Sequence, residues 1–556
     1  MKLLRLKITD PKGFRSLQTG FEYYFRTQWV LHTEQGFSPF VCAGPNGSGK
    51  SNLLEVIGAI FFHLDCKSLD YRPELFEYDP EKVPGGFREE KGIPDSFELE
   101  YLSRTFSGFD HEGELHQPHV RIVKESGRGP QFFVLNSKGI EAKTPLGRLL
   151  IKAVLPDFVV AYSSGENEIL SLPFFKMRFI HFDEYLDSVR NETPYAGQPE
   201  GRLVFLDQDL NQAILLSNFI LGEASHLQSY KDAMGLEGVT YFRIILRDIL
   251  YPSGQGVSSD NSDQWPILGN ARGIQEKLRQ CATAHFYDDV TDTHYMDYWL
   301  DDACQEAFAL HFGKPLDLFR AFQLLLTLNL YSVSNQNKLE MYQSESLYVN
   351  ETIPTLPSDQ RVMRFKDVVL KKTGVDATVY SKALSDGENQ FLHTLGLCTL
   401  YRDSNVLFLL DEPDTHFNPD WRSKFISRLK ECFPETSKKG GHEMLITTHT
   451  PFLISDSRPE KVLVFNKDKE TGVVSISKPD YNTLGASINK ITMNTFGKRE
   501  TIGGHAQLIL EGFRERLKNE KEDKEQLIEE INQQLGDSVE KMLLIKTILD
   551  SMKAKD

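Results

Sequence analysis

Three glycines and a lysine stand close together near the start of the chain, in the segment GPNGSGKS at residues 44–51. The spacing fits the GxxxxGK[ST] pattern of a phosphate-binding loop. Glycines let successive backbone N–H groups point into one nest, and a helix that starts there adds the positive end of its dipole. We expect Lys50 to reach the β- and γ-phosphates of ATP, and the Ser51 hydroxyl to hold Mg²⁺. The residues predicted to bind nucleotide here are Gly44, Pro45, Asn46, Gly47, Ser48, Gly49, Lys50, Ser51 and Asn52.

Two acidic residues follow an apolar run much later in the chain. Residues 405–413, NVLFLLDEP, are apolar up to Asp411 and Glu412, as in a central parallel strand that is buried on both faces. Asp411 is expected to hold Mg²⁺ together with Ser51. Glu412 is expected to orient and deprotonate the attacking water. A further apolar run, MLITTHTPFLI, contains His449 at the end of its strand, and we predict that this histidine senses the γ-phosphate.

The segment SKALSDGENQ, residues 381–390, narrows the class of nucleotide-binding protein. Within it, Leu384, Ser385, Asp386, Gly387 and Glu388 are close to the LSGGQ signature of ABC-type ATPases, and an apolar helical pattern follows. Together with GPNGSGKS, DEPDTHFNP and TTHTPF, this segment makes the chain resemble the ABC/SMC-like ATPases. More closely, the chain looks like the PtuA-type ATPases of Septu and retron-associated antiphage systems.

The resemblance implies a fold and an arrangement of subunits. The implied fold is α/β, an ABC-type (SMC/RecF-like) P-loop NTPase head with a large, mainly helical insertion. In this class the signature binds the γ-phosphate of ATP held by a second subunit, so we expect a homodimer of heads, with a higher oligomer left open. Asp414 would be the D-loop acid that reaches across the dimer. The acidic residues Asp386 and Glu388 depart from LSGGQ and are expected to weaken phosphate affinity or slow hydrolysis.

Two further positions stay ambiguous in the sequence. Arg15, in GFRSL, matches a position that contacts nucleotide in SMC-like heads, and a solvated arginine fits equally well. No glutamine marks the Q-loop. The turn SSGENE at residues 163–168 is the best candidate for that switch, with a plain polar turn as the alternative.

The elements that position these residues fall into four expected parts. Residues 1–200 are predicted to form the N-terminal part of the head, and residues 201–360 a mainly helical insertion. Residues 361–480 would complete the head, and residues 481–556 form a helical tail. Apolar spacing predicts that residues 271–332 are largely helical and that residues 252–263 form a mobile loop. In the tail, Leu527, Ile531, Leu535, Val539, Met542, Ile545 and Leu549 indicate an amphipathic helix pair, which we expect to pack back on the head rather than dock a partner.

Composition limits the function classes. The formal net charge of −16 argues against non-specific binding of nucleic acid by the whole surface. The apolar runs are too short to cross a bilayer, so we expect a cytoplasmic protein without a membrane partner. The six cysteines form no CxxC pair, which argues against structural zinc. No long heptad array is present, which excludes an extended coiled coil.

No set of residues for cutting nucleic acid is recognisable beside the ATPase motifs. The resemblance therefore implies a separate HNH nuclease of the PtuB kind, which this ATPase would gate. In retron-linked systems a reverse transcriptase with its RNA–DNA hybrid (msDNA) would be a further partner. The sequence leaves open whether this chain is of that kind. It also leaves open two other functions, a RecF-like repair or recombination ATPase and an ATP-dependent scaffold with negligible turnover. The cofactors expected in each case are ATP and Mg²⁺.

Overall fold

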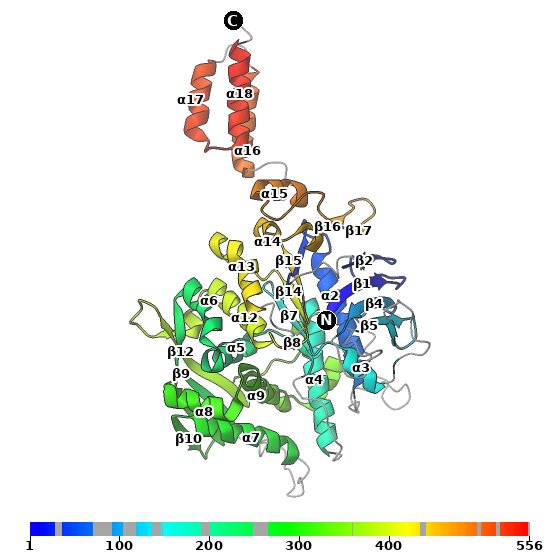
Figure 1. Cartoon of the computed structure of the whole chain (residues 1–556), viewed down its shortest axis with the longest axis vertical. Helices are drawn as coiled ribbons and strands as arrows, with labels where there is room; N and C mark the ends of the chain where they lie inside the picture. Colours follow the sequence, from blue (N-terminus) through cyan, green and yellow to red (C-terminus); the bar gives the residue numbers. More distant parts are fainter. Residues whose placement is uncertain are drawn as a thin grey trace.

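A computed structural model describes residues 1–27, 36–69, 92–103, 118–135, 146, 148–190, 201–247, 265–358, 360–433, 441–497, 502–518 and 523–553. Within these residues the chain forms three sheets surrounded by helices, and a helical bundle that stands apart at the C-terminal end (Figure 1). The loop predicted at residues 252–263 lies outside the described residues.

The central sheet carries the ends of the strands that the motifs follow. Its order is β17-β16-β3-β15-β14-β7-β8, and neighbouring strands are parallel except at β17. The strands are β3 (Phe40–Ala43), β7 (Phe158–Ser163), β8 (Leu203–Phe205), β14 (Val406–Asp411), β15 (His442–Thr448), β16 (Val462–Lys467) and β17 (Val474–Ser477). All six residues of β14 are buried, as predicted for a strand covered on both faces. In register, Asp411 lies beside Thr447 and Ser163, so the carboxyl ends of these strands meet at one edge.

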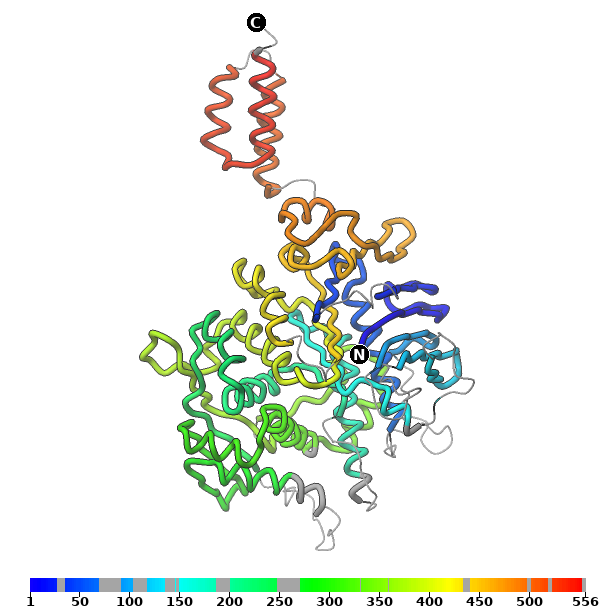
Figure 2. The backbone as a smooth tube through the Cα atoms, in the orientation of Figure 1, coloured from blue at the N-terminus to red at the C-terminus, as the bar shows by residue number. Residues whose placement is uncertain are grey.

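Segments far apart in the sequence therefore lie side by side. Figure 2 shows the blue N-terminal tube against the yellow and orange segments that follow residue 400. Hydrogen-bonded pairing explains this proximity, because β3 lies between β15 and β16.

An antiparallel sheet of order β2-β1-β4-β5-β6 covers one side of the helix after the phosphate-binding loop. Its strands are β1 (Lys2–Ile8), β2 (Glu22–Tyr24), β4 (Phe97–Leu102), β5 (His119–Lys124) and β6 (Gln131–Leu135). The period-two burial of β4 and β5 shows that one face of this sheet packs on the core. The sequence segments FELEYL, HVRIVK and QFFVL form β4, β5 and β6.

The third sheet corrects the expectation for residues 271–332. Two strands interrupt the helices there, β10 (Ala284–Asp288) and β11 (Thr293–Trp299), and they pair as a hairpin. They extend an antiparallel sheet of order β10-β11-β9-β12-β13 with β9 (Leu236–Arg247), β12 (Met363–Lys372) and β13 (Val379–Tyr380). The aromatic and β-branched residues of the hairpin favour strand. Met296 and Tyr298 of β11 are buried, whereas β10 is mostly exposed. The insertion thus combines many helices with a sheet.

Helices fill the space between the sheets. The helices of the head and insertion are α2 (Lys50–Ser68), α3 (Arg148–Val154), α4 (Glu168–Arg190), α5 (Gln208–Leu221), α6 (Ala224–Met234), α7 (Trp265–Cys281), α8 (Asp302–Phe312), α9 (Pro315–Thr327), α10 (Asn335–Gln343), α11 (Val349–Thr352), α12 (Asp386–Leu400), α13 (Pro419–Cys432), α14 (Pro451–Ser455) and α15 (Ile488–Phe496). Short 3₁₀ turns lie at Leu328–Ser332, Ser381–Ala383 and Pro459–Lys461.

The C-terminal helices contradict the expectation that the tail packs back on the head. Helices α16 (Gly504–Leu517), α17 (Lys524–Gln534) and α18 (Val539–Lys553) form a bundle with its own apolar core, and Figure 1 shows it projecting from the body. Leu527, Ile531 and Leu535 lie in that core. Val539, Met542 and Leu549 of α18 are exposed instead. Three short helices can bury their apolar faces against one another, so the head is not needed as a partner.

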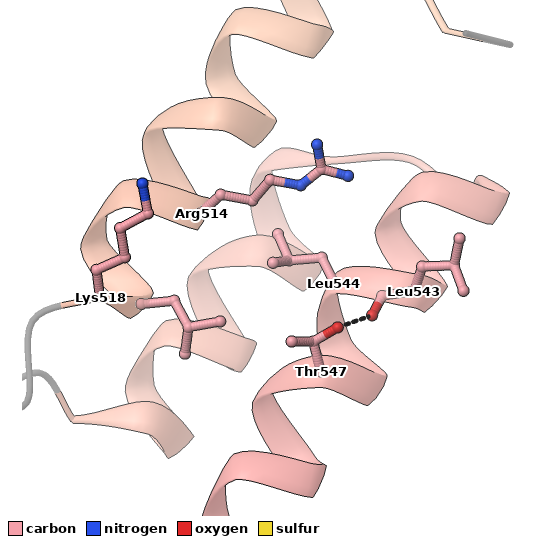
Figure 3. Close-up of a pocket in the computed structure, with 6 residues that line it drawn as sticks. Arg514, Lys518, Leu543, Leu544 and Thr547 are labelled. Carbon is pink, nitrogen blue, oxygen red and sulfur yellow. Dashed lines mark hydrogen bonds between the residues drawn. The ribbon is translucent and has the colours of Figure 1, made fainter. Parts of the chain in front are cut away.

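A pocket in this bundle lies between α16 and α18 (Figure 3). It is lined by Arg514, Leu517, Lys518, Leu543, Leu544 and Thr547. The Thr547 hydroxyl donates a hydrogen bond of 2.8 Å to the Leu543 carbonyl of its own helix. This pocket contains none of the predicted site residues. Among the described residues, no helix is long and apolar enough to span a membrane.

Candidate functional site

The phosphate-binding loop is a tight turn between β3 and α2. Every residue of β3 is buried, and α2 begins at Lys50 directly after Gly49, which caps it with a φ of 96°. Gly44 is held close to the neighbouring strand, because a Cβ there would lie 2.4 Å from the Phe465 carbonyl oxygen. A side chain at either glycine would disturb the loop. The predicted strand–loop–helix arrangement is therefore present.

Lys50 is buried in this loop. Its Nζ donates hydrogen bonds of 3.0 Å to the carbonyl oxygens of Gly44 and Pro45. Burial lowers the pKa of Lys50 to about 8, and the negative charges of Glu412 and Asp411 partly oppose that shift. The ammonium group thus faces the two acids of the β14 tip, within the loop that would surround the phosphates.

The Asp411 carboxylate, at the end of β14, accepts three side-chain hydrogen bonds. Its Oδ1 accepts from the hydroxyls of Ser51 at 2.8 Å and Thr447 at 2.6 Å, and its Oδ2 accepts from the Asn167 side chain at 3.0 Å. Ser51 and Asp411, predicted to share Mg²⁺, are therefore adjacent. Hydroxyl and carboxylate oxygens are the ligands that Mg²⁺ prefers, so this donor set fits the ion.

Glu412 is held in an unusual backbone conformation, with a φ of 51°. The left-handed region costs a non-glycine residue about 1–3 kcal/mol and is maintained only where its surroundings enforce it. Its N–H donates to Thr447 Oγ1 at 3.0 Å, and its carbonyl accepts from Thr415 Oγ1 at 2.9 Å. Gln390, from α12, lies 3.4 Å from the same carbonyl. The acid that follows the strand is thus fixed by hydrogen bonds on both of its peptide groups.

His449 and Glu412 are in contact. Nε2 of His449 lies 2.6 Å from Oε1 of Glu412, and each side chain is about one-third exposed. The hydrogen bond from His449 lowers the pKa of Glu412, and burial opposes that effect. The two predicted catalytic residues therefore form a pair at the carboxyl edge of the sheet, near Lys50.

The signature segment forms a helix start that caps itself. Ser385 is the N-cap of α12, and its Oγ accepts from the Glu388 N–H at 3.3 Å. The Glu388 carboxylate accepts from the Ser385 N–H at 2.9 Å, which completes a capping box. Nζ of Lys372, on β12, lies 2.6 Å from the same carboxylate. Burial alone would raise the pKa of Glu388, but the hydrogen bonds from Lys372 and Ser385 outweigh burial and lower that pKa.

The other signature residues lie around this helix start. Leu384 is buried, Asp386 is exposed, and Gly387 packs so closely on the next loop that a Cβ would lie 2.7 Å from the His416 carbonyl oxygen. Within the described part of the chain, the polar contacts of Ser385 and Glu388 do not reach the phosphate-binding loop of the same chain.

Arg15 lies beside the phosphate-binding loop. It is exposed and has a φ of 57° in the turn between Phe14 and Leu17. The next residue, Ser16, hydrogen-bonds with the Asn52 side chain on α2. The turn is therefore anchored at the loop, and no contact of the arginine itself decides between nucleotide binding and solvation.

Asp414 is positioned differently from the sequence-based expectation. A D-loop acid that reaches across a dimer should be on the surface, but Asp414 is only 1% exposed. Its carboxylate accepts hydrogen bonds from Thr448 and Thr450 of the same chain. In this structure the side chain points inward, so its role across a dimer stays a prediction that this geometry does not favour.

Three residues of the site carried no recognisable motif in the sequence. Asn167, in the turn SSGENE, donates to both Asp411 and Glu55, at 3.0 and 3.1 Å. Glu55 also accepts from Asn52, and burial raises its pKa. Thr447 joins Asp411 to the Glu412 backbone. The turn after β7 thus brings an asparagine side chain to the site, and its role as a switch stays a prediction.

Comparison with known proteins found two similarities in sequence. The family model described as "AAA domain, putative AbiEii toxin, Type IV TA system" matches residues 254–455. Septu protein PtuA from Bacillus thuringiensis is 25% identical over 125 residues, which cover 22% of this chain and 30% of that protein. The match thus spans less than a third of the relative's length. The chain is thus similar, over part of its length, to this AAA domain family and to PtuA.

Two solved structures are also similar. One is an SMC head bound to the C-winged helix domain of ScpA, with 12% identity, 86% coverage of this chain, 98% coverage of that chain and a TM-score of 0.33. The other is the SMC head domain from Thermotoga maritima, with 14% identity, 86% and 100% coverage and a TM-score of 0.31. Scores this low describe only a distant likeness.

Proposed function

We propose that this chain is the ATP-binding and ATP-hydrolysing subunit of a cytoplasmic antiphage defence complex, and that its nucleotide state gates a separate nuclease. One observation carries the enzymatic part. Lys50, Ser51, Asp411, Glu412 and His449, which come from three distant segments, meet at the carboxyl edge of one parallel sheet. The similarity to PtuA supports the defence role.

Each residue has a specific task in ATP hydrolysis. Lys50 and the loop N–H groups would hold the phosphates, and Ser51 with Asp411 would hold Mg²⁺. The bound ion neutralises charge that develops on the phosphoryl oxygens. Glu412 would accept a proton from the attacking water, and the low pKa of its carboxyl keeps it ionised at neutral pH. His449, in contact with Glu412, is placed to sense the γ-phosphate.

The complete site would form between two chains. Each chain has one phosphate-binding loop and one signature segment, and a head-to-head homodimer pairs each loop with the partner's signature. The helix start at Ser385 would face the γ-phosphate. Because the carboxylate of Glu388 already occupies the N-terminus of α12, we expect weak phosphate affinity and slow turnover.

The nuclease partner is proposed to be an HNH protein of the PtuB kind. Closure and opening of the heads would be the rigid-body change that reaches it. A reverse transcriptase with its RNA–DNA hybrid stays a prediction for a retron-linked system. On this proposal the purified chain hydrolyses ATP slowly and does not cut DNA or RNA in the presence of Mg²⁺.

The test combines calorimetry with co-purification. Lys50→Ala should abolish binding of a non-hydrolysable ATP analogue, whereas Lys67→Ala, at the far end of the same helix, should bind it normally. The chain is then purified with the protein products of its neighbouring genes, and cleavage of DNA by the mixture is measured with and without ATP. Normal binding by Lys50→Ala refutes the nucleotide site. Robust cutting by the single chain refutes the division of labour.

A further inference from the structure

A buried carboxylate lies directly behind the proposed catalytic pair. Asp414 follows β14 by three residues and is 1% exposed. An ionisable group in such a place costs free energy unless hydrogen bonds compensate. Burial raises the pKa of Asp414, and the hydroxyls of Thr450 and Thr448 oppose that shift. The buried Asp414 carboxylate is therefore energetically unfavourable, and its hydrogen-bond partners indicate what role it has.

The partners of Asp414 flank His449 on both sides. Thr450 Oγ1 donates to Asp414 Oδ2 at 2.6 Å, and Thr448 Oγ1 lies 3.2 and 3.3 Å from the two carboxylate oxygens. The Thr450 N–H also donates to Thr448 Oγ1 at 3.0 Å. The turn that carries His449 is thus attached to one carboxylate at the residue before it and at the residue after it.

The Thr450 hydroxyl bonds to Asp414 and does not cap the helix that follows it. It is the N-cap of α14, where a threonine hydroxyl usually accepts from the first turn of the helix, yet it makes no such bond. Its hydroxyl donates to Asp414 instead. The local sequence would favour capping, so the carboxylate determines how this turn is oriented.

The backbone that carries this carboxylate is held by the following helix. Arg422 of α13 donates from Nε to the Asp414 carbonyl at 3.1 Å and from Nη2 to the Thr415 carbonyl at 2.7 Å. The Glu412 backbone is held by direct hydrogen bonds with Thr447 and Thr415. On the other side of the His449–Glu412 contact, the Asp414 carboxylate accepts the direct hydrogen bonds from the turn that carries the histidine.

From this geometry we infer that Asp414 is a positioning residue that holds His449 against Glu412 within the same chain. The inference rests on the proposed ATPase function and assigns Asp414 to its own subunit's site rather than to the partner's. Losing the carboxylate should leave ATP binding intact and reduce turnover, since a catalytic group displaced by about 1 Å can cost on the order of 100-fold in rate.

The first experiment is a double-mutant cycle on ATP turnover. Asp414→Ala should lower kcat by about tenfold or more, with affinity for a non-hydrolysable ATP analogue within about twofold of wild type. In a His449→Ala background the same change should cost nothing further. Thr450→Val should reproduce the loss, and Thr450→Ser, which keeps the hydroxyl, should restore turnover. Asp420→Asn, an exposed acid on α13, is the matched control. Independent, additive losses from Asp414→Ala and His449→Ala overturn the inference.

Mixed dimers separate a role in the same chain from a role in the partner. One chain carries Lys50→Ala, so the only working phosphate-binding loop belongs to the other chain. Asp414→Ala should lower the remaining turnover by about tenfold or more when it is placed in the chain with the intact loop. It should be tolerated in the Lys50→Ala chain. The reverse pattern would show that Asp414 acts across the dimer and refutes the inference.

A measurement that does not depend on ATP turnover separates the positioning role of Asp414 from the proposed function. In histidine-labelled protein, Asp414→Asn should shift the ring resonances of His449, which are identified by their loss in His449→Ala. If the wild-type protein binds ATP but shows no hydrolysis, the proposed enzymatic function fails, and this spectrum alone decides the positioning role. An unchanged His449 resonance rules that role out.

Discussion

The burial of Lys50 predicts an unusual pH dependence of nucleotide binding. In the free protein, burial lowers the pKa of Lys50 to about 8. Phosphate groups beside the ammonium would raise that pKa in the complex, since an opposite charge favours the charged form. Binding should therefore take up a proton once the pH rises above about 8. Affinity is fully present below that pH and declines above it.

The magnitude follows from the protonated fraction of the free protein. With a pKa of about 8, only about 3% of Lys50 carries its proton at pH 9.5. The apparent affinity for ATP should then be about 30-fold weaker at pH 9.5 than at pH 7, provided that the bound lysine stays charged. At the ordinary lysine pKa of 10.5 the same change of pH would weaken affinity by only about 10%.

The assay is calorimetric titration with a non-hydrolysable ATP analogue between pH 7 and pH 9.5, in buffers of different ionisation enthalpy. The phosphates ionise below this range, so the lysine is the group that changes. The heat should depend on the buffer at pH 9 and not at pH 7. Because Glu412 raises the pKa of Lys50, Glu412→Gln should move the midpoint of the decline to lower pH. An affinity that is level up to pH 9.5, with no proton uptake, would refute the reasoning.

Three further outcomes are expected. Glu412→Gln should bind ATP but release phosphate at least about 100-fold more slowly in a steady-state assay, because the proton acceptor is gone; wild-type turnover would exclude its role as base. A mixture of Lys50→Ala and Ser385→Arg chains should recover up to one working site per heterodimer, measured as phosphate release; no recovery despite proven heterodimers would count against shared sites. A chain that ends before residue 502 should keep the ATP affinity of the full chain in calorimetry, because the removed bundle has its own core; a collapse in melting temperature would show that the bundle supports the head.

The parts of the site that were predictable are those set by local spacing. GPNGSGKS needs its glycines within one turn, and the apolar run to Asp411 needs burial on both faces, so both segments carry their geometry in a few residues. The head fold follows from the order of these segments. Only the arrangement of the strands, however, shows that Ser51 and Asp411 come within 2.8 Å of each other.

The parts that were missed depend on distant partners. Asn167 reaches Asp411 because β7 pairs with β14, and no pattern around residue 167 records that pairing. Asp414 looks like a surface acid in DEPDTHFNP, and only its contacts with Thr448 at the end of β15 and Thr450 before α14 reveal it as buried. The hairpin at β10 and β11 was missed because its short apolar runs do not distinguish helix from strand.

The left-handed backbone conformation of Glu412 is strained, so the residue that the proposed activity needs lowers the stability of the fold. Glycine, or less fully asparagine, adopts this conformation with less strain, so Glu412→Gly would relieve about 1 kcal/mol while it removes the proposed base. A single substitution at Glu412 can thus give a protein that is more stable but has lost its proposed ATPase activity. Such variants would carry no penalty in folding, so selection for the proposed activity alone would keep the strained glutamate at this position.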